Sequence, residues 1–414
     1  MTVPEPSTEL VLGSGHAPIE GMGRAPDGRL TIGQVVPDWG TLQTPAFLYS
    51  SEIVGQRIER LRRLFPADLR IHYAVKANPL PALLRWCAGR LDGADVASGA
   101  ELQAAIDAGF APERVGFAGP GKREGEIALA ARLGAVVTVE SERQWALAAR
   151  HGARVAVRVN PALELRGAGQ TMGGGASPFG VDAEALPALI ATARTRGWPA
   201  PEGLHVYFGS QILGGDRIAQ ALRACAAAAQ GWVDALGGAP AWLNLGGGFG
   251  VPYFPGESAL SLDPVAQALH EIAGRWARHA PDTRLRIELG RWLVAEAGIY
   301  ACRVLERKVS RGKTFLVTDG GLHHLQAATG TLGQVIRRNY PLALAGRAGI
   351  DADSAETVDV VGPLCTPLDC LGRGVRLPRA EPGDVVVVFR AGAYGATASP
   401  TAFLGHPPAL EQLL

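Results

Sequence analysis

Apolar residues in the middle of the chain occur in short runs that are separated by longer segments of helical spacing. Between residues 44 and 298, Ala-, Leu- and Arg-rich segments with apolar residues every three or four positions alternate with runs of β-branched and other apolar residues. The first pattern is typical of amphipathic helices and the second of buried strands. We therefore expect strands within residues 46–50, 71–75, 93–98, 114–119, 136–140, 154–160, 203–209, 242–247 and 284–290.

The spacing of these runs favours one class of fold. Neighbouring runs lie about 20 to 45 residues apart, which leaves room for a crossover helix between parallel strands. Eight or so strands joined in this way are typical of a TIM-type (β/α)8 barrel. The sequence therefore predicts an α/β fold with a barrel over residues 45–298.

The pattern changes after residue 298. The runs RVLERKVS, KTFLVTDGG, TVDVVGPLC and GDVVVVFRAGAYG read as strands joined by turns, with little helix between them. Such a pattern predicts a mainly antiparallel β domain. Because the first 44 residues have the same strand-and-turn character, we expect residues 1–44 and 299–414 to form this second domain together.

Charge and cysteine content exclude several classes of function. The 414 residues carry 40 Lys and Arg against 39 Asp and Glu, so no overall field attracts nucleic acid or an anionic membrane. No apolar run approaches the roughly 18 residues of a membrane span, and the acidic start lacks a signal pattern, so we expect a cytoplasmic protein. The five cysteines are scattered without CxxC spacing, which argues against a disulfide framework or a metal site.

A lysine at the end of a predicted strand is the first candidate for chemistry. The chain has only four lysines, and Lys76 follows the apolar run 71–75. The carboxyl ends of barrel strands face the active site. A lysine desolvated there has a lowered pKa and can form a Schiff base with an aldehyde. The alternative is a lysine that extends its amine to solvent at the rim of the barrel.

Four further segments carry candidate groups. The glycine-rich loop 244–250 follows a strand, and its backbone amides could surround a phosphate. The segment 288–291 ends another strand and offers a carboxylate and a guanidinium, which could equally form a surface ion pair. Cys365 lies in a loop framed by glycine and proline. It could be a reactive thiol or a small buried residue that only fills space in the core. Tyr394 is flanked by glycines.

Together these motifs carry a family resemblance over nearly the whole chain. YAVKAN, DVASGAEL, FAGPGK, SPFG, HVYFGSQ, GGGFG, ELGR, CTPLD and GAYG occur in family order. The chain resembles the fold-type III decarboxylases that use pyridoxal 5'-phosphate (PLP), which include diaminopimelate, ornithine and arginine decarboxylases. GQVIRRNYP, VVGPLCTPLD and SPTAFLGHP are most similar to exosortase-associated members. The chain is also similar to the butirosin-pathway enzyme, which acts on a glutamyl group borne by an acyl carrier protein.

The resemblance implies an alanine racemase-like fold and three catalytic residues. Lys76 would hold PLP as an internal aldimine, and Glu288 would keep the pyridine nitrogen protonated. This favours loss of CO2 into a quinonoid, whereas racemases of the same barrel place an arginine there. Cys365 would then protonate the quinonoid carbon. Because that loop reaches the neighbouring subunit's site in the family, a homodimer with shared active sites is implied.

The resemblance also assigns cofactor contacts. Arg158 would lie near the phenolic oxygen of PLP, and Tyr207 stands where the family has a histidine that stacks on the ring. The phosphate would be held by Ser210, Gly246, Gly247, Gly248, Arg291 and Tyr394, and the DVAS and ELGR motifs add Asp95 and Gly290.

One departure from the family pattern bears on the substrate. Thr366 follows the loop cysteine, where diamine-forming members have an acid that receives the substrate's distal ammonium. Since threonine cannot supply that charge, we expect a free amino acid without a distal amine, or an aminoacyl group on a carrier protein. Asp369, Arg337, Arg338 and Tyr340 are further candidates for substrate contacts, although the arginines could equally be solvated surface residues.

Other activities stay open at this stage. Diaminopimelate decarboxylase, which makes lysine, is the first alternative, and Thr366 opposes it. A racemase would need a second base and a neutral pyridine, which Glu288 opposes. A PLP-binding regulator without catalysis is a third alternative, and the retained Lys76, Glu288 and Cys365 oppose it.

Overall fold

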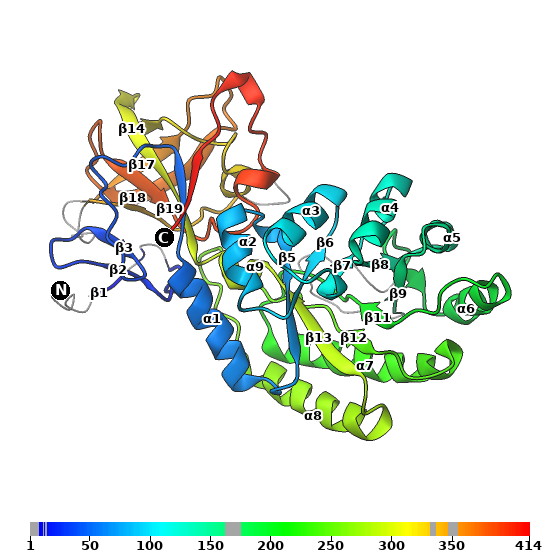
Figure 1. The fold of residues 1–414 in the computed structure, drawn as a ribbon. Helices are drawn as coiled ribbons and strands as arrows, with labels where there is room; N and C mark the ends of the chain where they lie inside the picture. The colour runs from blue at the N-terminus through cyan, green and yellow to red at the C-terminus, as the bar shows by residue number, and fades with distance from the viewer. Residues whose placement is uncertain (1–7, 11, 13–14, 162–174, 332–336, 347–354) are drawn as a thin grey trace. The chain divides into compact units, whose positions relative to one another are not determined.

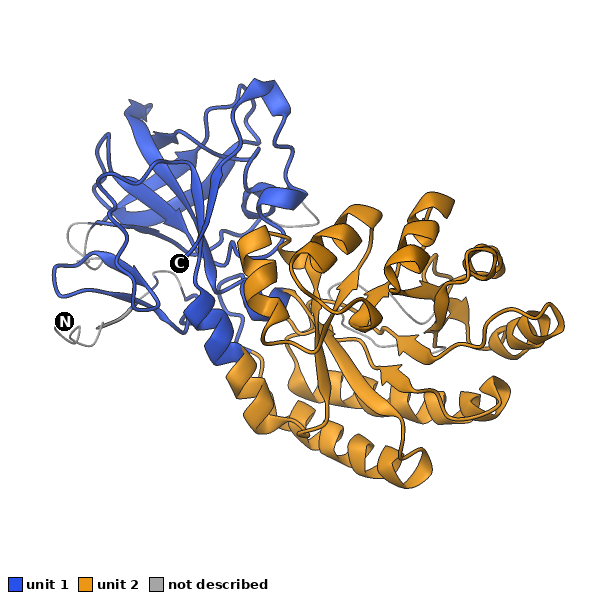
Figure 2. Ribbon diagram, in the orientation of Figure 1, with its two compact units in different colours: residues 1–57, 251–259, 291–414 blue, residues 58–250, 260–290 orange. Residues whose placement is uncertain are grey.

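The chain divides into two compact units. The computed structural model describes residues 8–10, 12, 15–161, 175–331, 337–346 and 355–414 (Figure 1). Unit 1 comprises residues 1–57, 251–259 and 291–414, and unit 2 comprises residues 58–250 and 260–290 (Figure 2). The motif GQVIRRNYP lies partly outside the described residues.

Unit 2 contains a closed barrel of parallel strands. Its eight strands follow the order β9-β11-β12-β13-β5-β6-β7-β8, and β8 pairs with β9 to close the ring. A short strand, β10 (Val181–Asp182), pairs in parallel with β9 outside the ring. The barrel strands are β5 (Arg70–Ala74), β6 (Gly93–Val96), β7 (Val115–Phe117), β8 (Val136–Val139), β9 (Arg154–Asn160), β11 (Gly203–Val206), β12 (Trp242–Asn244) and β13 (Arg284–Leu289). The predicted (β/α)8 barrel is confirmed.

Helices follow the strands, as a parallel barrel requires. Figure 1 shows them outside the strands of unit 2. Two begin at a serine whose hydroxyl caps the helix: Ser98 accepts from Glu101 N, and Ser141 accepts from Gln144 N. The helices are α1 (Ser51–Leu64), α2 (Pro81–Ala88), α3 (Gly99–Asp107), α4 (Glu124–Leu133), α5 (Glu142–Arg150), α6 (Leu186–Thr195), α7 (Gly215–Leu236) and α8 (Asp263–His279). None of the helices in the described ranges has the length and apolar character that a bilayer crossing needs.

Unit 1 is built on a mainly antiparallel sheet. The order is β16-β19-β14-β15-β17-β18, and β4 joins the sheet between β14 and β20. Only the β15–β17 and β4–β20 pairs are parallel among its described pairings. The strands are β4 (Ala46–Tyr49), β14 (Gly298–Ser310), β15 (Lys313–Thr318), β16 (Leu342–Leu344), β17 (Ala355–Val361), β18 (Cys370–Pro378), β19 (Val385–Val388) and β20 (Leu410–Leu413). The prediction of a second, mainly antiparallel region is confirmed.

Smaller elements complete unit 1. The first strands, β1 (Thr8–Glu9), β2 (Met22–Arg24) and β3 (Leu30–Ile32), form a separate antiparallel sheet. A single turn of helix, α9 (Arg291–Val294), precedes β14. Short 3-10 turns in the chain as a whole are Val75–Ala77, Pro112–Arg114, Gln326–Thr329, Ala396–Ala398 and Phe403–Gly405.

One expected barrel strand belongs to the other sheet. The run 46–50 forms β4, which pairs with β14 and β20 and not with a barrel strand. All four residues of β4 are buried and a helix follows, so the run has the same pattern as a barrel strand. Its place depends on pairing that periodicity cannot reveal, because β13 already pairs with β5 to complete the ring. The domain limits at residues 45 and 298 stay a prediction.

Candidate active site

Lys76 lies on a short turn directly after a barrel strand. Strand β5 ends at Ala74, and the 3-10 turn Val75–Ala77 follows with Val75 and Ala77 buried. The Tyr73 hydroxyl donates to the Asn78 carbonyl at 2.8 Å and closes the turn. Lys76 itself is exposed, which agrees with the alternative of an amine that reaches solvent at the rim and differs from a desolvated side chain. The difference arises because the turn carries Lys76 beyond the end of the buried strand.

The aromatic ring of Tyr207 lies beside both Lys76 and Arg158. Its Nζ is 6.0 Å from the centroid of the Tyr207 ring. The Arg158 Cζ is 5.6 Å from the same centroid and 5.1 Å from that of Phe179. The fold thus brings Lys76, Tyr207 and Arg158 together from segments far apart in the sequence, with the Tyr207 ring as their common neighbour.

Glu288 is a largely buried carboxylate with partners on two neighbouring strands. Its Oε2 is 3.4 Å from His205 Nε2 on β11 and accepts a hydrogen bond of 3.2 Å from Asn244 Nδ2 on β12. Burial raises the pKa of Glu288, but the adjacent His205, with Lys76 and Arg158, outweighs burial and brings the pKa below its ordinary value. Glu288 is therefore ionised at neutral pH and can act as the counter-charge of a protonated ring nitrogen.

Neither His205 nor Asn244 appears among the predicted site residues. His205 pairs in register with Asn244 across β11 and β12, and with Arg158 across β9 and β11. All three are buried polar residues near the ends of barrel strands. Their shared strand-end position is a signal in the sequence, but it needs the strand register before the side chains can be matched.

The glycine-rich loop after β12 is shaped by close backbone approaches. Gly246 and Gly248 have φ of +72° and +78°, which favours glycine. A Cβ on Gly246 would lie 2.8 Å from the Val206 carbonyl oxygen, and a Cβ on Gly247 would overlap the Glu288 carbonyl oxygen. The backbone of this loop therefore has no room for side chains, which is the kind of cradle that a phosphate occupies.

Hydrogen bonds connect this loop to its surroundings. The Asn244 side chain accepts from Gly246 N at 2.9 Å, so one residue touches both the loop and Glu288. Ile212 N donates to the Gly248 carbonyl at 2.9 Å and places the segment that contains Ser210 beside the loop. Gly290 is equally constrained, because a Cβ there would lie 2.7 Å from the Ala77 Cβ in the Lys76 turn.

A second buried carboxylate, Glu140, supports Arg158. Its Oε2 accepts from Gly180 N at 2.9 Å and lies 3.6 Å from Arg158 Nη1, and its Oε1 lies 3.7 Å from Lys122 Nζ. Burial lowers the pKa of Lys122, and Glu140 compensates only in part, so the pKa is about 8. Neither Glu140 nor Lys122 is among the predicted site residues, although FAGPGK contains the lysine. In the sequence, these two residues could have been noticed only as charged residues in segments that are otherwise apolar.

Asp95 pairs with a histidine of the neighbouring strand. His72 Nδ1 lies 3.2 Å from Asp95 Oδ2, at ion-pair distance but without hydrogen-bond alignment. His72 is on β5 and Asp95 on β6, and both side chains are largely buried. Asp95 is therefore part of the polar interior near Lys76, one strand away from it.

Unit 1 contains a cluster of Arg291 and tyrosines. Arg291 Nη1 donates to the Tyr253 hydroxyl at 3.2 Å, and its Cζ lies 4.6 Å from the centroid of Tyr394. The Tyr340 ring packs against Tyr253 with centroids 4.8 Å apart. Tyr394 adopts φ of +56°, a costly conformation for a tyrosine that directs its ring over the guanidinium. Tyr253 was not predicted, although it follows the glycine-rich loop closely.

Cys365 differs from the other four cysteines in its exposure. Cys87, Cys225, Cys302 and Cys370 are buried, whereas Cys365 is exposed in the loop between β17 and β18. Burial raises the pKa of Cys87 and of Cys225 to about 12, which makes both inert thiols. Thr366 is half-buried beside Cys365, and Asp369 is only 2% exposed.

The two predicted arginines have protein partners. Arg337 donates through Nη2 to the Cys370 carbonyl, at the end of the Cys365 loop. Arg338 Nη1 lies 3.2 Å from Glu257, and its Cζ lies 3.9 Å from the centroid of Phe254. Arg337 is therefore the closer of the two to the residues of the loop, while Arg338 is paired with an acid.

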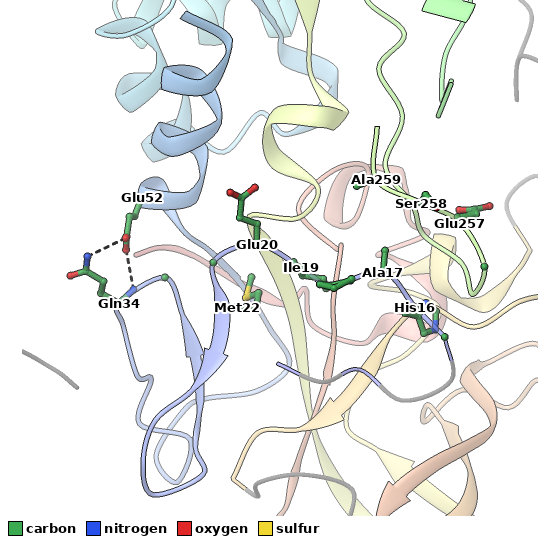
Figure 3. A pocket seen from close by; sticks show the side chains of 15 residues that line it. His16, Ala17, Ile19, Glu20, Met22, Gln34, Glu52, Glu257, Ser258 and Ala259 are labelled. Carbon is green, nitrogen blue, oxygen red and sulfur yellow. Dashed lines mark hydrogen bonds between the residues drawn. The ribbon is translucent and has the colours of Figure 1, made fainter. Parts of the chain in front are cut away.

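A cavity of about 980 Å³ lies elsewhere in unit 1 (Figure 3). Residues 15–22, 33–34, 52 and 256–259 line it, and none of them is a predicted site residue. Glu52 accepts from the backbone and side chain of Gln34 at 2.9 and 3.2 Å at one end of the cavity. Within the described ranges, no group of three or more His, Cys, Asp or Glu side chains could hold a metal ion.

Comparison with known proteins gives consistent results. Residues 51–295 match the family described as pyridoxal-dependent decarboxylase, pyridoxal binding domain. The L-glutamyl-[BtrI acyl-carrier protein] decarboxylase of Niallia circulans is 35% identical over 381 residues, which cover 90% of this chain and 89% of the relative. The diaminopimelate decarboxylase of Deinococcus radiodurans is 35% identical over 376 residues, with 89% and 90% covered.

Solved structures of diaminopimelate decarboxylases are also similar to this chain. The crystal structure of Helicobacter pylori diaminopimelate decarboxylase in complex with L-lysine aligns with a TM-score of 0.79 and 28% identity. The alignment covers 90% of this chain and 92% of that chain. The likeness includes both the barrel and the antiparallel sheet, since it extends over most of each chain.

Proposed function

The chain belongs to the pyridoxal-dependent decarboxylases, and we propose that it decarboxylates a substrate that has no distal ammonium group. It is a PLP-dependent amino-acid decarboxylase, and PLP is its cofactor. The first candidate substrate is an aminoacyl group tethered to a carrier protein, and the second is a free amino acid without a distal amine. The observation that carries the proposal is Thr366, which stands beside Cys365 where an acid would be needed to pair a distal ammonium.

The residues of unit 2 fit PLP. Lys76 offers an amine on a turn, Glu288 an ionised carboxylate, and Gly246–Gly248 a backbone cradle without side chains. When bound, PLP supplies the electron sink that accepts the electron pair left by departing CO2. We assign the remaining contacts with PLP to Asp95, Arg158, Tyr207, Ser210, Gly290, Arg291 and Tyr394.

The polar partners of these residues fix charge and orientation. His205 and Asn244 hold Glu288 through one oxygen, and the nearby cations keep it ionised, so Glu288 can retain a proton on a ring nitrogen. Glu140 holds Arg158 in place through an ion pair in which both side chains are buried. Preorganised charges of this kind need no rearrangement during the reaction.

Cys365 is the group that we assign to proton delivery. A thiol can give a proton to the carbon that has lost its carboxyl group. Cys365 is exposed, and Leu368 of the same loop exposes 55% of its surface. An exposed thiol and an exposed leucine on one loop support a homodimer in which this loop completes the active site of the partner subunit.

The carrier-protein substrate has two supports. The Niallia circulans relative is named for a glutamyl group on an acyl carrier protein, and it shares 35% identity over most of its length. Arg337 lies at the end of the Cys365 loop and offers a cation, which suits a carboxylate or phosphate at the far end of a substrate better than an ammonium.

We also propose a cytoplasmic location, supported by five free cysteines.

The test is mass spectrometry of reactions that contain the PLP-loaded enzyme. A panel of free amino acids, including diaminopimelate, lysine and glutamate, is compared with the same aminoacyl groups loaded on an acyl carrier protein. Loss of one CO2 from a substrate without a distal ammonium supports the proposal. Equal or faster loss of CO2 from free diaminopimelate or lysine contradicts it and favours diaminopimelate decarboxylase.

A further inference from the structure

Asp369 joins the Cys365 loop to a separate segment of unit 1. Its carboxylate accepts from Leu322 N at 2.6 Å through Oδ1 and from Leu364 N at 2.8 Å through Oδ2. Leu322 follows β15, while Leu364 immediately precedes Cys365. Both carboxylate oxygens are therefore used by backbone amides of two segments that are distant in the sequence.

The surroundings of Asp369 are shaped to this carboxylate. A Cβ on Gly321 would lie 2.8 Å from the Asp369 Cγ, and a Cβ on Gly362 would lie 2.6 Å from it. Real side chains do not approach so closely, so both positions require glycine while Asp369 is in place. Asp369 is 2% exposed, which leaves its carboxylate little access to a substrate.

The loop also closes on itself through its backbone. Gly362 N donates to the Asp369 carbonyl at 3.1 Å, and Asp369 N donates to the Thr366 carbonyl at 3.2 Å. Thr366 N donates to the Leu364 carbonyl at 2.8 Å, across Cys365. The exposed thiol thus lies at a tight turn whose two ends both depend on Asp369.

We propose that Asp369 is a positioning residue that fixes the Cys365 thiol by holding its loop to the Leu322 backbone, and that it is not a substrate ligand. The inference rests on the proposed role of Cys365 as proton donor. Replacement of the carboxylate by an amide turns an NH2 group toward one of the two backbone donors. One buried amide then loses its acceptor, and the loop loses its fixed position.

The test is a double-mutant cycle on the holoenzyme with Asp369→Asn, Cys365→Ala and the pair. Asp369→Asn should lower kcat about tenfold while KM stays within about twofold, because the loop acts on proton delivery and not on binding. In the Cys365→Ala background, Asp369→Asn should change kcat by less than about twofold, since the thiol that it positions is gone.

A matched control and a direct structural readout accompany the cycle. Asp359 is another buried carboxylate of unit 1 and accepts from Gly374 N at 2.7 Å, so Asp359→Asn controls for loss of a buried charge. Its effect on kcat should be the same with and without Cys365. Amide hydrogen exchange at Leu322 and Leu364 should become faster in Asp369→Asn and stay slow in Asp359→Asn.

The outcomes separate the two claims. An equal loss of kcat from Asp369→Asn in both backgrounds, or unchanged exchange at Leu322 and Leu364, overturns the positioning role while the role of Cys365 stands. Wild-type kcat for Cys365→Ala overturns the proposed proton donor and the positioning role with it. If Asp369→Asn does not fold, Gly321→Ala displaces the carboxylate without changing its charge and should give the same cycle.

Discussion

The barrel cluster around Glu288 and the loop of Cys365 are built in different ways. In the barrel, Glu288 is held by His205 and Asn244, and Arg158 by Glu140, all on neighbouring strands or directly after them. The loop has a single buried charge, Asp369, which serves its backbone, while Cys365 itself is exposed. The barrel region encloses the charged side chains of Glu288 and Arg158, and the loop presents its thiol outward.

The difference follows from the charge that each region must hold. A buried carboxylate or guanidinium is costly unless it is paired, so the barrel cluster needs a counter-charge or donor at every position. A neutral thiol has no such requirement and needs only a defined position. We therefore expect variants of the barrel cluster to affect stability as well as the reaction, and loss of the loop thiol to affect turnover while stability and cofactor binding stay close to wild type.

Lys76→Ala is expected to have the largest effect. The variant loses the amine that binds PLP, so the visible absorbance of the holoenzyme should disappear and activity should fall by at least about a thousandfold. Lys308→Ala, at an exposed position on β14, is the control and should retain both. A Lys76→Ala protein that stays yellow after dialysis would remove Lys76 from its assigned role.

Glu288→Gln tests whether ionisation matters in the barrel cluster. The amide cannot stabilise a proton on the ring nitrogen, so kcat should fall by about a hundredfold or more while the protein still binds PLP. Absorbance spectra and steady-state rates measure the two effects separately. Unchanged kcat would show that the carboxylate charge is not used in the reaction.

Glu288 also predicts the direction of a pH effect on stability. Because its pKa is lower in the folded chain than in the unfolded chain, its stabilising contribution is present at neutral pH and is lost as the pH falls through the folded-state pKa. Urea unfolding of the wild type and of Glu288→Gln should therefore differ most at pH 7 and converge in acid. A difference that grows in acid would contradict this sign.

Cys365→Ala should slow turnover and leave the cofactor in place. We expect kcat to fall by about ten- to a hundredfold, since only proton delivery is affected, while PLP absorbance and the midpoint of thermal unfolding stay close to wild type. Cys225→Ala is the opposite case, because Cys225 is a buried cysteine of the barrel unit. This variant should lower the midpoint of thermal unfolding and leave kcat close to wild type.

Thr366→Glu should have the smallest effect and changes specificity. The added carboxylate can pair the distal ammonium of a diamino acid, so weak decarboxylation of lysine or diaminopimelate should appear. Chromatography of the product amine measures it, with Thr366→Gln as the uncharged control. Equal activity of both variants on these substrates would mean that charge at residue 366 does not select the substrate.

Sequence reasoning succeeds where a pattern is local. The barrel strands follow from apolar runs such as 154–160, which forms β9 with the predicted limits. It fails for the run 46–50, because an apolar strand followed by a helix does not reveal which strand it will pair with. The partners of Glu288 and Arg158 were missed for the same reason, since His205 and Glu140 become neighbours only through strand register.

The Cys365 loop shows the opposite limit. The motif identifies Cys365, Thr366 and Asp369 together and gives no means of separating their roles. Burial and hydrogen bonds separate them, because Asp369 is enclosed and binds two backbone amides while Cys365 is exposed. A motif thus locates chemistry, and the direction of each side chain decides which residue performs it.

The most direct test of this comparison is complementation between two inactive subunits. Lys76→Ala and Cys365→Ala chains are unfolded together, refolded with PLP and assayed, with each variant refolded alone as the control. If the loop of one subunit serves the barrel of its partner, half of the dimers are mixed and each has one intact site, so about a quarter of wild-type activity should return. Activity no higher than the average of the two separate variants would contradict the shared site.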